Sequence, residues 1–153
     1  MAGLCGDCGA CCTTLEVEEI GKKSDQPCVY LGKTDCGYGC KKYKDRPEAC
    51  LGYICLWLDS QRRKNTEKFS EKLRPDICHV VLGWPYAQDR TVLFVYPDKN
   101  FPTAWQKPPV SEYLRMIVSR GAKLMVVVGK HRFAIKNDMM VSGTEEEFEN
   151  LLS

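Results

Sequence analysis

Cysteine is the residue that most constrains what this chain can fold into. Ten cysteines occur in 153 residues, and nine of them precede residue 56. The run at residues 5–12, CGDCGACC, alone holds four. A segment so rich in cysteine and glycine has little apolar surface to bury, so cross-links or metal ions must replace part of a core. The fold of the N-terminal third therefore depends on what its thiols bind.

Two chemistries compete for these thiols. Disulfides persist in oxidising compartments, whereas thiolate–metal bonds are typical of reducing ones. The N-terminus, MAGLCGDCGACC, has no basic region followed by a long apolar stretch, and no later segment offers about 18 uncharged apolar residues. We therefore expect a cytoplasmic protein with neither a secretion signal nor a membrane span. Metal ligation is favoured, and disulfide pairing is the weaker alternative.

The spacing of the cysteines predicts more than one metal centre. Cys5 and Cys8 form a C-x-x-C pair, which can bind one tetrahedral ion at about 2.3 Å per bond. The glycines around them permit turns that point backbone N–H groups at the sulfurs. Cys11 and Cys12 are adjacent and cannot both reach one ion without strain, so they serve two centres or one of them bridges. Eight thiolates would suffice for two four-coordinate sites, the remaining four being Cys28, Cys40, Cys50 and Cys55.

Several ordered motifs carry a family resemblance. They are CGDCGACC at residues 5–12, Pro27-Cys28 followed by Leu31, Cys40-Lys-Lys-Tyr43, Arg46-Pro47-Glu48-Ala49-Cys50 and Cys55-Leu-Trp57-Leu, with Leu73-Arg-Pro-Asp76 and His79-Val-Val-Leu82 further on. This arrangement, over residues 5–82, resembles the CxxCxxCC family of zinc- or iron-chelating cysteine-cluster proteins. The resemblance implies eight ligands, Cys5, Cys8, Cys11, Cys12, Cys28, Cys40, Cys50 and Cys55.

Two cysteines stand outside this set. Cys36 lies four residues before Cys40 and is an alternative ligand to it. Cys78 lies in an apolar stretch, where a small buried core residue is the simpler interpretation.

Zinc and an iron–sulfur cluster both remain open as the bound group. Cys5, Cys8 and Cys11 match the start of a bacterial ferredoxin run, but Cys12 follows at once where that run requires three residues, Cys and Pro. This mismatch favours zinc. The resemblance keeps iron open, because the family includes an N-methyltransferase branch with a reported cluster. Redox chemistry or methyl transfer from S-adenosylmethionine is therefore the enzymatic alternative.

Other function classes find little support. A zinc ion closed by four thiolates has no open position for hydrolysis, so a structural, interaction or metal-handling role is favoured, with a protein partner as one use. Neither histidine, His79 or His131, lies in a metal-binding motif, and no nucleotide-binding or serine-hydrolase motif occurs. A net charge of +2 is too small for a dedicated nucleic-acid-binding protein, so such binding would depend on the local basic segment Arg62–Arg74. A solvated surface is the simpler interpretation of that segment.

We expect an α+β fold in one small domain. Residues 1–58 would form an irregular, metal-bound, cysteine-cluster region with a turn at 36–40, and residues 59–153 a β-rich region with one or two helices packed on it. A short helix starting at Arg46-Pro47 would carry Cys50 and extend toward Cys55.

The second region shows clearer periodicity. Strands are predicted at 77–82 and 91–96, and a helix capped by Ser111 should stop at Gly121. A strand at 122–128 would turn through Gly129 into a hairpin partner at 131–136. Thr144 and Glu147 form a capping box that predicts a terminal helix.

Overall fold

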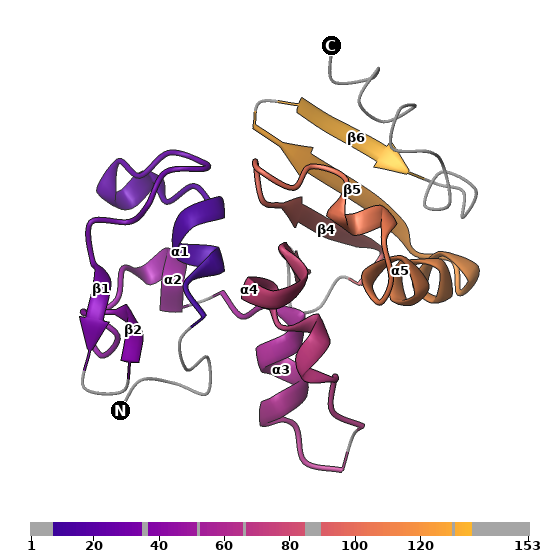
Figure 1. Cartoon of the computed structure of the whole chain (residues 1–153), viewed down its shortest axis with the longest axis horizontal. Helices are drawn as coiled ribbons and strands as arrows, with labels where there is room; N and C mark the ends of the chain where they lie inside the picture. The colour runs from indigo at the N-terminus through magenta and orange to yellow at the C-terminus, as the bar shows by residue number, and fades with distance from the viewer. Residues whose placement is uncertain are drawn as a thin grey trace.

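The computed structural model describes residues 8–34, 37–51, 53–65, 67–84, 90–129 and 131–135. Within these ranges the chain is an α+β protein, as the sequence predicts. Figure 1 shows the N-terminal, cysteine-rich part on one side and the larger sheet on the other, with α4 (Pro75–Cys78) between them. Cys5, Cys36 and the predicted helix beginning at Thr144 lie outside the described residues.

The larger sheet has the strand order β3-β4-β5-β6. Its strands are β3 (Val80–Gly83), β4 (Val92–Pro97), β5 (Lys123–Val128) and β6 (His131–Ile135). The outer pairs are antiparallel, which confirms the predicted hairpin of β5 and β6. The central pair, β4 and β5, is parallel and needs a crossover, which η3 (Ala104–Gln106) and α5 (Val110–Ser119) provide.

The main hydrophobic core lies between this sheet and the crossover. Alternate residues of β4, Leu93 and Val95, are fully buried, as a strand with one covered face requires. Trp105 of η3 and Leu114 of α5 pack on them and are equally buried. Apolar burial therefore specifies this half of the molecule.

Two predicted boundaries in this half are wrong by a few residues. α5 begins at Val110 with Pro109 as its N-cap, and Ser111 is buried inside the first turn without capping by its side chain. Val110 and Leu114, one turn apart, both face the core, and this packing sets the start. Gly121 follows the helix with φ +95°, as predicted.

The strand predicted at 77–82 begins only at Val80. Ile77 and Cys78 belong instead to α4, which has Pro75 at its first position and Asp76 in its first turn. Both residue types favour a helix start. His79 ends the helix in the left-handed conformation, with φ 62°, and turns the chain into β3.

The cysteine-rich part consists of short elements. They are α1 (Ala10–Thr14), η1 (Glu18–Ile20), β1 (Leu31–Thr34), β2 (Gly37–Cys40) and α2 (Glu48–Leu51), followed by α3 (Leu56–Arg62) and η2 (Glu71–Leu73). β1 and β2 form an antiparallel hairpin, so the turn expected at 36–40 is largely a strand. Cys55 is not on α2 but is the N-cap of α3.

Little apolar burial supports this part. Of the described residues up to position 58, Leu56 alone belongs to the main core cluster. The basic segment Arg62–Arg74 begins at the last residue of α3 and includes η2. α3 lies beside β3, and Leu73 of η2 packs against the core. Across the ranges given above, no helix has the length and apolar character needed to span a bilayer.

Candidate metal centre

One cavity of about 950 Å³ gathers most of the predicted ligands. Four residues of the sheet region also line the cavity, namely Tyr96, Val127, Gly129 and Arg132. Cys78, which the structure also describes, is not among the lining residues. The cysteines that line the cavity are Cys8, Cys11, Cys12, Cys28, Cys40, Cys50 and Cys55.

These thiols surround a common space without yet forming a closed site. In the described part of the chain, no three or more Cys, His, Asp or Glu side chains stand close enough together to hold an ion. None of the eight described cysteines forms a disulfide. Binding of an ion would therefore require the cavity walls to move inward.

The electrostatic neighbours of the sulfurs divide them into two groups. The first cysteine group is Cys12, Cys28, Cys40 and Cys50, whose thiols influence one another. The second cysteine group is Cys8, Cys11 and Cys55: Cys8 neighbours Cys55, and both Cys11 and Cys55 neighbour the hydroxyl of Tyr53. Cys11 also hydrogen-bonds to Cys12, so the adjacent pair joins the two groups.

Backbone contacts hold the first group in place. The N–H of Cys28 donates to the carbonyl of Cys12 at 2.9 Å, which ties α1 to the segment before β1. The N–H of Tyr30 donates to the sulfur of Cys28 at 3.5 Å, and that of Lys42 donates to the sulfur of Cys40. An N–H two residues beyond a cysteine supports a thiolate without any charged side chain.

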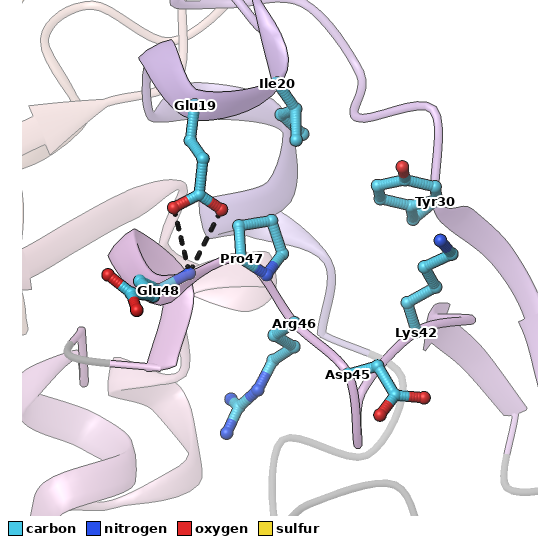
Figure 2. A pocket seen from close by; sticks show the side chains of 8 residues that line it. All are labelled: Glu19, Ile20, Tyr30, Lys42, Asp45, Arg46, Pro47 and Glu48. Carbon is cyan, nitrogen blue, oxygen red and sulfur yellow. Dashed lines mark hydrogen bonds between the residues drawn. The ribbon is translucent and has the colours of Figure 1, made fainter.

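The helix that carries Cys50 is α2, and it is held in place by a contact with η1. Its first residue, Glu48, donates its N–H to both carboxylate oxygens of Glu19 in η1, at 3.2 and 3.1 Å. Figure 2 shows this contact at the edge of a shallow pocket. A carboxylate at the N-terminus of a helix satisfies an orphan donor and the helix dipole together. η1 therefore fixes the helix that carries Cys50.

Two cations face the first group. Lys22 is only 7% exposed, and its ammonium donates to the carbonyls of Thr13, Leu15 and Lys23, which are neutral acceptors. Burial lowers the pKa of Lys22, while the thiols of Cys28 and Cys12 act in the opposite direction. Asp25 is a further charged neighbour of Lys22, and thiolates would add more negative charge beside this buried cation.

Arg46 is the second cation of this group. Its guanidinium lies 4.1 Å from the centre of the Tyr43 ring and influences Cys12, Cys40 and Cys50. The pKa of the Cys12 thiol falls to about 7, first because Cys11 hydrogen-bonds to it and then because Lys22 and Arg46 favour the thiolate. Burial acts in the opposite direction at Cys40 and Cys50, where it raises the pKa.

The second group has a different setting. Burial raises the pKa of Cys8 to about 12, although the backbone N–H groups of Ala10 and Asp76 both donate to its sulfur. The Cys55 sulfur accepts the N–H of Leu58 at 3.5 Å, as a helix N-cap. The charged neighbours of Cys8 are the carboxylate of Asp76 and the guanidinium of Arg74.

Tyr53 closes the second group toward the sheet. Its hydroxyl is buried without a hydrogen-bond partner among the described residues, and burial raises its pKa. The ring packs over Gly83 of β3, where an added Cβ would lie 2.8 Å from the Tyr53 oxygen. The absence of a side chain at Gly83 therefore makes room for Tyr53.

The sequence alone does not single out Lys22 and Tyr53, which line the cavity, or Asp76, which neighbours Cys8. Lys22 and Tyr53 are isolated in sequence and carry no motif. Asp76 has a signal, because Arg74-Pro-Asp-Ile-Cys78 repeats the pattern of Arg46-Pro-Glu-Ala-Cys50.

The histidines and the basic segment lie apart from the cavity lining. The His79 ring stacks on Phe101, with ring centres 3.8 Å apart, and His131 begins β6. In the basic segment, Arg62 donates to the Tyr43 hydroxyl at 2.9 Å and Arg63 pairs with Asp59 at 2.8 Å. These contacts are those of an ordinary surface helix, and the nucleic-acid hypothesis stays an untested prediction.

Comparisons with protein-family models, curated proteins and solved structures find no match. The case for a function therefore rests on the residues of the site.

Proposed function

We propose that this protein binds metal, most simply zinc, in two cysteine-built centres that hold its N-terminal part folded and support an interaction or metal-handling role. The observation that carries the proposal is the convergence of seven cysteines on one cavity. Cys11 and Cys12 lie in α1, and Cys8 lies two residues before it. Cys28 precedes β1, and Cys40 ends β2. Cys50 lies in α2, and Cys55 is the N-cap of α3. A reducing compartment such as the cytoplasm would keep these thiols available.

The first cysteine group supports a closed, four-thiolate zinc centre. Four thiolates carry two more negative charges than one Zn²⁺ neutralises. Lys22 and Arg46 neighbour the sulfurs of this group, so their positive charges would offset the excess negative charge. Their positions are consistent with a centre of structural type.

Unsatisfied donors beside the sulfurs support the same proposal. Among the described residues, Arg46 Nε and the Tyr53 hydroxyl are buried without a hydrogen-bond partner. Arg46 neighbours the first cysteine group and Tyr53 the second. Metal-bound thiolates accept hydrogen bonds from such donors, and buried polar groups are normally satisfied. The donors therefore fit negatively charged metal centres on both sides of the cavity.

Metal binding must contract the cavity, because the thiols do not yet stand at bonding distance. Zinc–sulfur bonds of about 2.3 Å would draw α1, β2 and α2 together. This coupling of binding to folding is typical of small metal domains. It predicts that the protein becomes more compact when loaded.

Metal analysis of the full chain, purified without oxygen, tests the proposal. We expect a colourless protein with about two zinc ions, as eight donors at four per ion require. Cys12→Ser should lower the zinc content, whereas Cys78→Ser, a cysteine off the cavity, should not. A brown protein with acid-labile sulfide would show that the bound group is an iron–sulfur cluster rather than zinc. A chain that binds neither metal nor cluster would refute the proposal.

A further inference from the structure

One side-chain contact joins two basic segments that are distant in sequence. The first is residues 41–46, which follow β2, and the second is residues 62–72, which run from the end of α3 into η2. Arg62 of the second segment donates its Nη2 group to the hydroxyl of Tyr43 in the first, at 2.9 Å. Tyr43 has a lysine on either side of it in sequence, so this contact brings cations of the two segments together.

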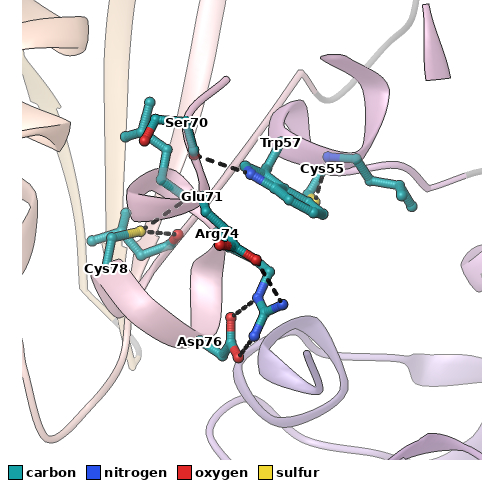
Figure 3. Close-up of polar contacts among 10 residues, drawn as sticks. Cys55, Trp57, Ser70, Glu71, Arg74, Asp76 and Cys78 are labelled. Carbon is teal, nitrogen blue, oxygen red and sulfur yellow. Dashed lines mark hydrogen bonds and ion pairs between the residues drawn. The ribbon is translucent and has the colours of Figure 1, made fainter. Parts of the chain in front are cut away.

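The second segment folds back toward the same contact. Lys68 Nζ donates to the carbonyl of Gln61 at 3.0 Å, and the Gln61 amide donates to the carbonyl of Phe69 at 3.0 Å. Trp57 of α3 donates its ring N–H to the carbonyl of Ser70 at 3.2 Å, as Figure 3 shows. The residues that follow α3 therefore lie against this helix, and Lys68 is held beside its C-terminal end.

The joined segments concentrate positive charge. They hold nine Lys and Arg against three Asp and Glu, although the whole chain has a net charge of only +2. The rest of the molecule is therefore net acidic. Residues 62–74 alone would be an ordinary charged surface, which is the usual meaning of a charge run. Joined to residues 41–46, they form a broader cationic surface than either segment forms alone.

Most cations of this surface have no acidic partner. Arg63 is paired with Asp59. Arg74, just beyond the second segment, is paired with Glu71 and Asp76 (Figure 3). Six exposed cations around the Tyr43 contact form no ion pair with any residue that the structure describes, so their charges are available to an external anion. We call them the basic surface; they are Lys41, Lys42, Lys44, Arg62, Lys64 and Lys68.

Side chains of this kind suit the phosphate backbone of a nucleic acid. Phosphate contacts come largely from Lys, Arg and polar side chains such as Tyr, and they do not depend on base sequence. Arg62 uses one of its five N–H donors on Tyr43. This bond fixes the planar guanidinium and leaves its other donors for phosphate oxygens. The contact that joins the segments thus also orients a phosphate-binding group.

Two other macromolecular partners fit this surface less well. Lysine is depleted in protein–protein interfaces, whose cores are apolar and aromatic. Stable binding to a membrane surface takes an apolar insertion or a lipid anchor in addition to basic residues. No large hydrophobic side chain that the structure shows as exposed belongs to either basic segment; these side chains are Val29, Leu51, Ile77, Phe101 and Met116. The lack of an apolar anchor therefore favours nucleic acid.

We propose that the basic surface binds the phosphate backbone of nucleic acid without sequence preference, and that residues 41–46 and 62–72 contribute to this binding together. The surface uses neither the cysteines nor the cavity, so nucleic-acid binding is a further function beside the proposed metal binding.

Fluorescence anisotropy with labelled single-stranded RNA and labelled duplex DNA, both of mixed sequence, tests the basic surface. The full chain, purified without oxygen, should bind either probe with a Kd of about 1–100 µM at physiological salt, and log affinity should fall linearly with log salt concentration. Lys44→Gln and Lys68→Gln, one from each segment, should each reduce the salt slope by about 1 and the affinity by about 3–10-fold. The double variant should show both losses.

The matched control is Lys107→Gln combined with Lys123→Gln, which removes the same charge from exposed positions of the sheet region. This control should keep the wild-type slope. Equal losses in control and test variants would overturn the proposal, because net charge alone would then explain the binding. Dependence on Lys68 but not on Lys44 would also overturn it, because the two segments would not act together.

Vesicles of phosphatidylcholine and phosphatidylserine test the membrane as a partner, and binding to them without binding to RNA or DNA would refute the proposal. Zinc content, measured on the same samples, separates this surface from the proposed metal-binding function. A zinc-loaded protein that binds neither nucleic acid would refute the basic surface alone. A protein that binds RNA but holds neither metal nor cluster would refute metal binding alone.

Discussion

The four-stranded sheet and the cysteine-rich part of this protein are stabilised by different physical means. In the sheet region, Leu93, Val95 and Leu124 are fully buried among other apolar side chains. In the cysteine-rich part, the buried groups include Lys22, with its carbonyl partners, and Thr14. One half is specified by hydrophobic burial and the other by polar contacts and thiols. The two halves should therefore fail under different perturbations.

Removal of metal should have the largest effect and should be confined to the cysteine-rich part. Structural zinc contributes roughly 10–16 kcal/mol of apparent binding free energy in small metal domains. We expect chelation to unfold at least residues 8–58, while β3 to β6 keep their structure. Hydrogen exchange followed by mass spectrometry would measure both regions in one experiment. Unchanged protection of residues 8–58 after complete removal of metal would show that ions do not replace a core there.

The converse perturbation is a cavity in the sheet region. Leu93 is fully buried in β4, so Leu93→Ala should lower the free energy of unfolding by about 2–5 kcal/mol. Met116→Ala, on the exposed side of α5, should cost well under that. Chemical denaturation measures both. The number of bound metal ions should be the same in both variants, and a loss in Leu93→Ala alone would mean that the two halves are not independent.

Gly83 of β3 is a point of close contact between the two halves. A Cβ at this position would stand 2.8 Å from the Tyr53 oxygen and 3.2 Å from a ring carbon. Gly83→Ala should therefore cost about 1–3 kcal/mol through overpacking and should displace Tyr53 from the second cysteine group. Removal of the hydroxyl with Tyr53→Phe should relieve part of that cost, which a double-mutant cycle would measure. Strict additivity would contradict a direct clash.

The sequence predicts the structure of the sheet region better than that of the cysteine-rich part. Short, nearly continuous apolar runs at 91–96 and 122–128 predict β4 and β5, because runs of this length and composition are typical of buried strands. In the cysteine-rich part, thiol spacing identifies the residues of the cavity, including Cys12, Cys28 and Cys50, but not how they group. The grouping depends on contacts between distant segments, such as Glu19 with α2 and Asp76 with Cys8, for which no local periodicity exists.

Boundaries fail for a related reason. Ile77 and Cys78 are apolar and read as the start of a strand, yet Pro75 and Asp76 begin a helix turn just before them. Ser111 has the residue type of a cap, but burial of Val110 moves the N-cap of α5 two residues earlier, to Pro109. In both cases tertiary packing decides between two local signals that are each reasonable.

The smallest expected effect is the contribution of one residue of the sheet region, Tyr113, to the pH dependence of the free energy of unfolding. Burial raises the pKa of Tyr113 in α5, against a smaller opposite effect from Arg90 and Arg120, and its ring packs on Phe69 with centres 4.9 Å apart. In the unfolded chain a tyrosine ionises near pH 10, whereas the folded chain holds the proton to higher pH. The folded state therefore binds more protons above that pH, and its stability must fall as pH rises through this range.

Tyr113→Phe removes this group from the titration. Between about pH 9 and pH 11, the variant should lose less unfolding free energy than the wild type, by at most about 1.4 kcal/mol per pH unit. Denaturation curves of metal-loaded protein at several pH values measure the difference. Because Tyr113 packs within the sheet region, metal content should stay equal in the two proteins over the same range. Parallel losses in wild type and variant would mean that burial of this hydroxyl does not resist its ionisation, and that the alkaline response arises elsewhere.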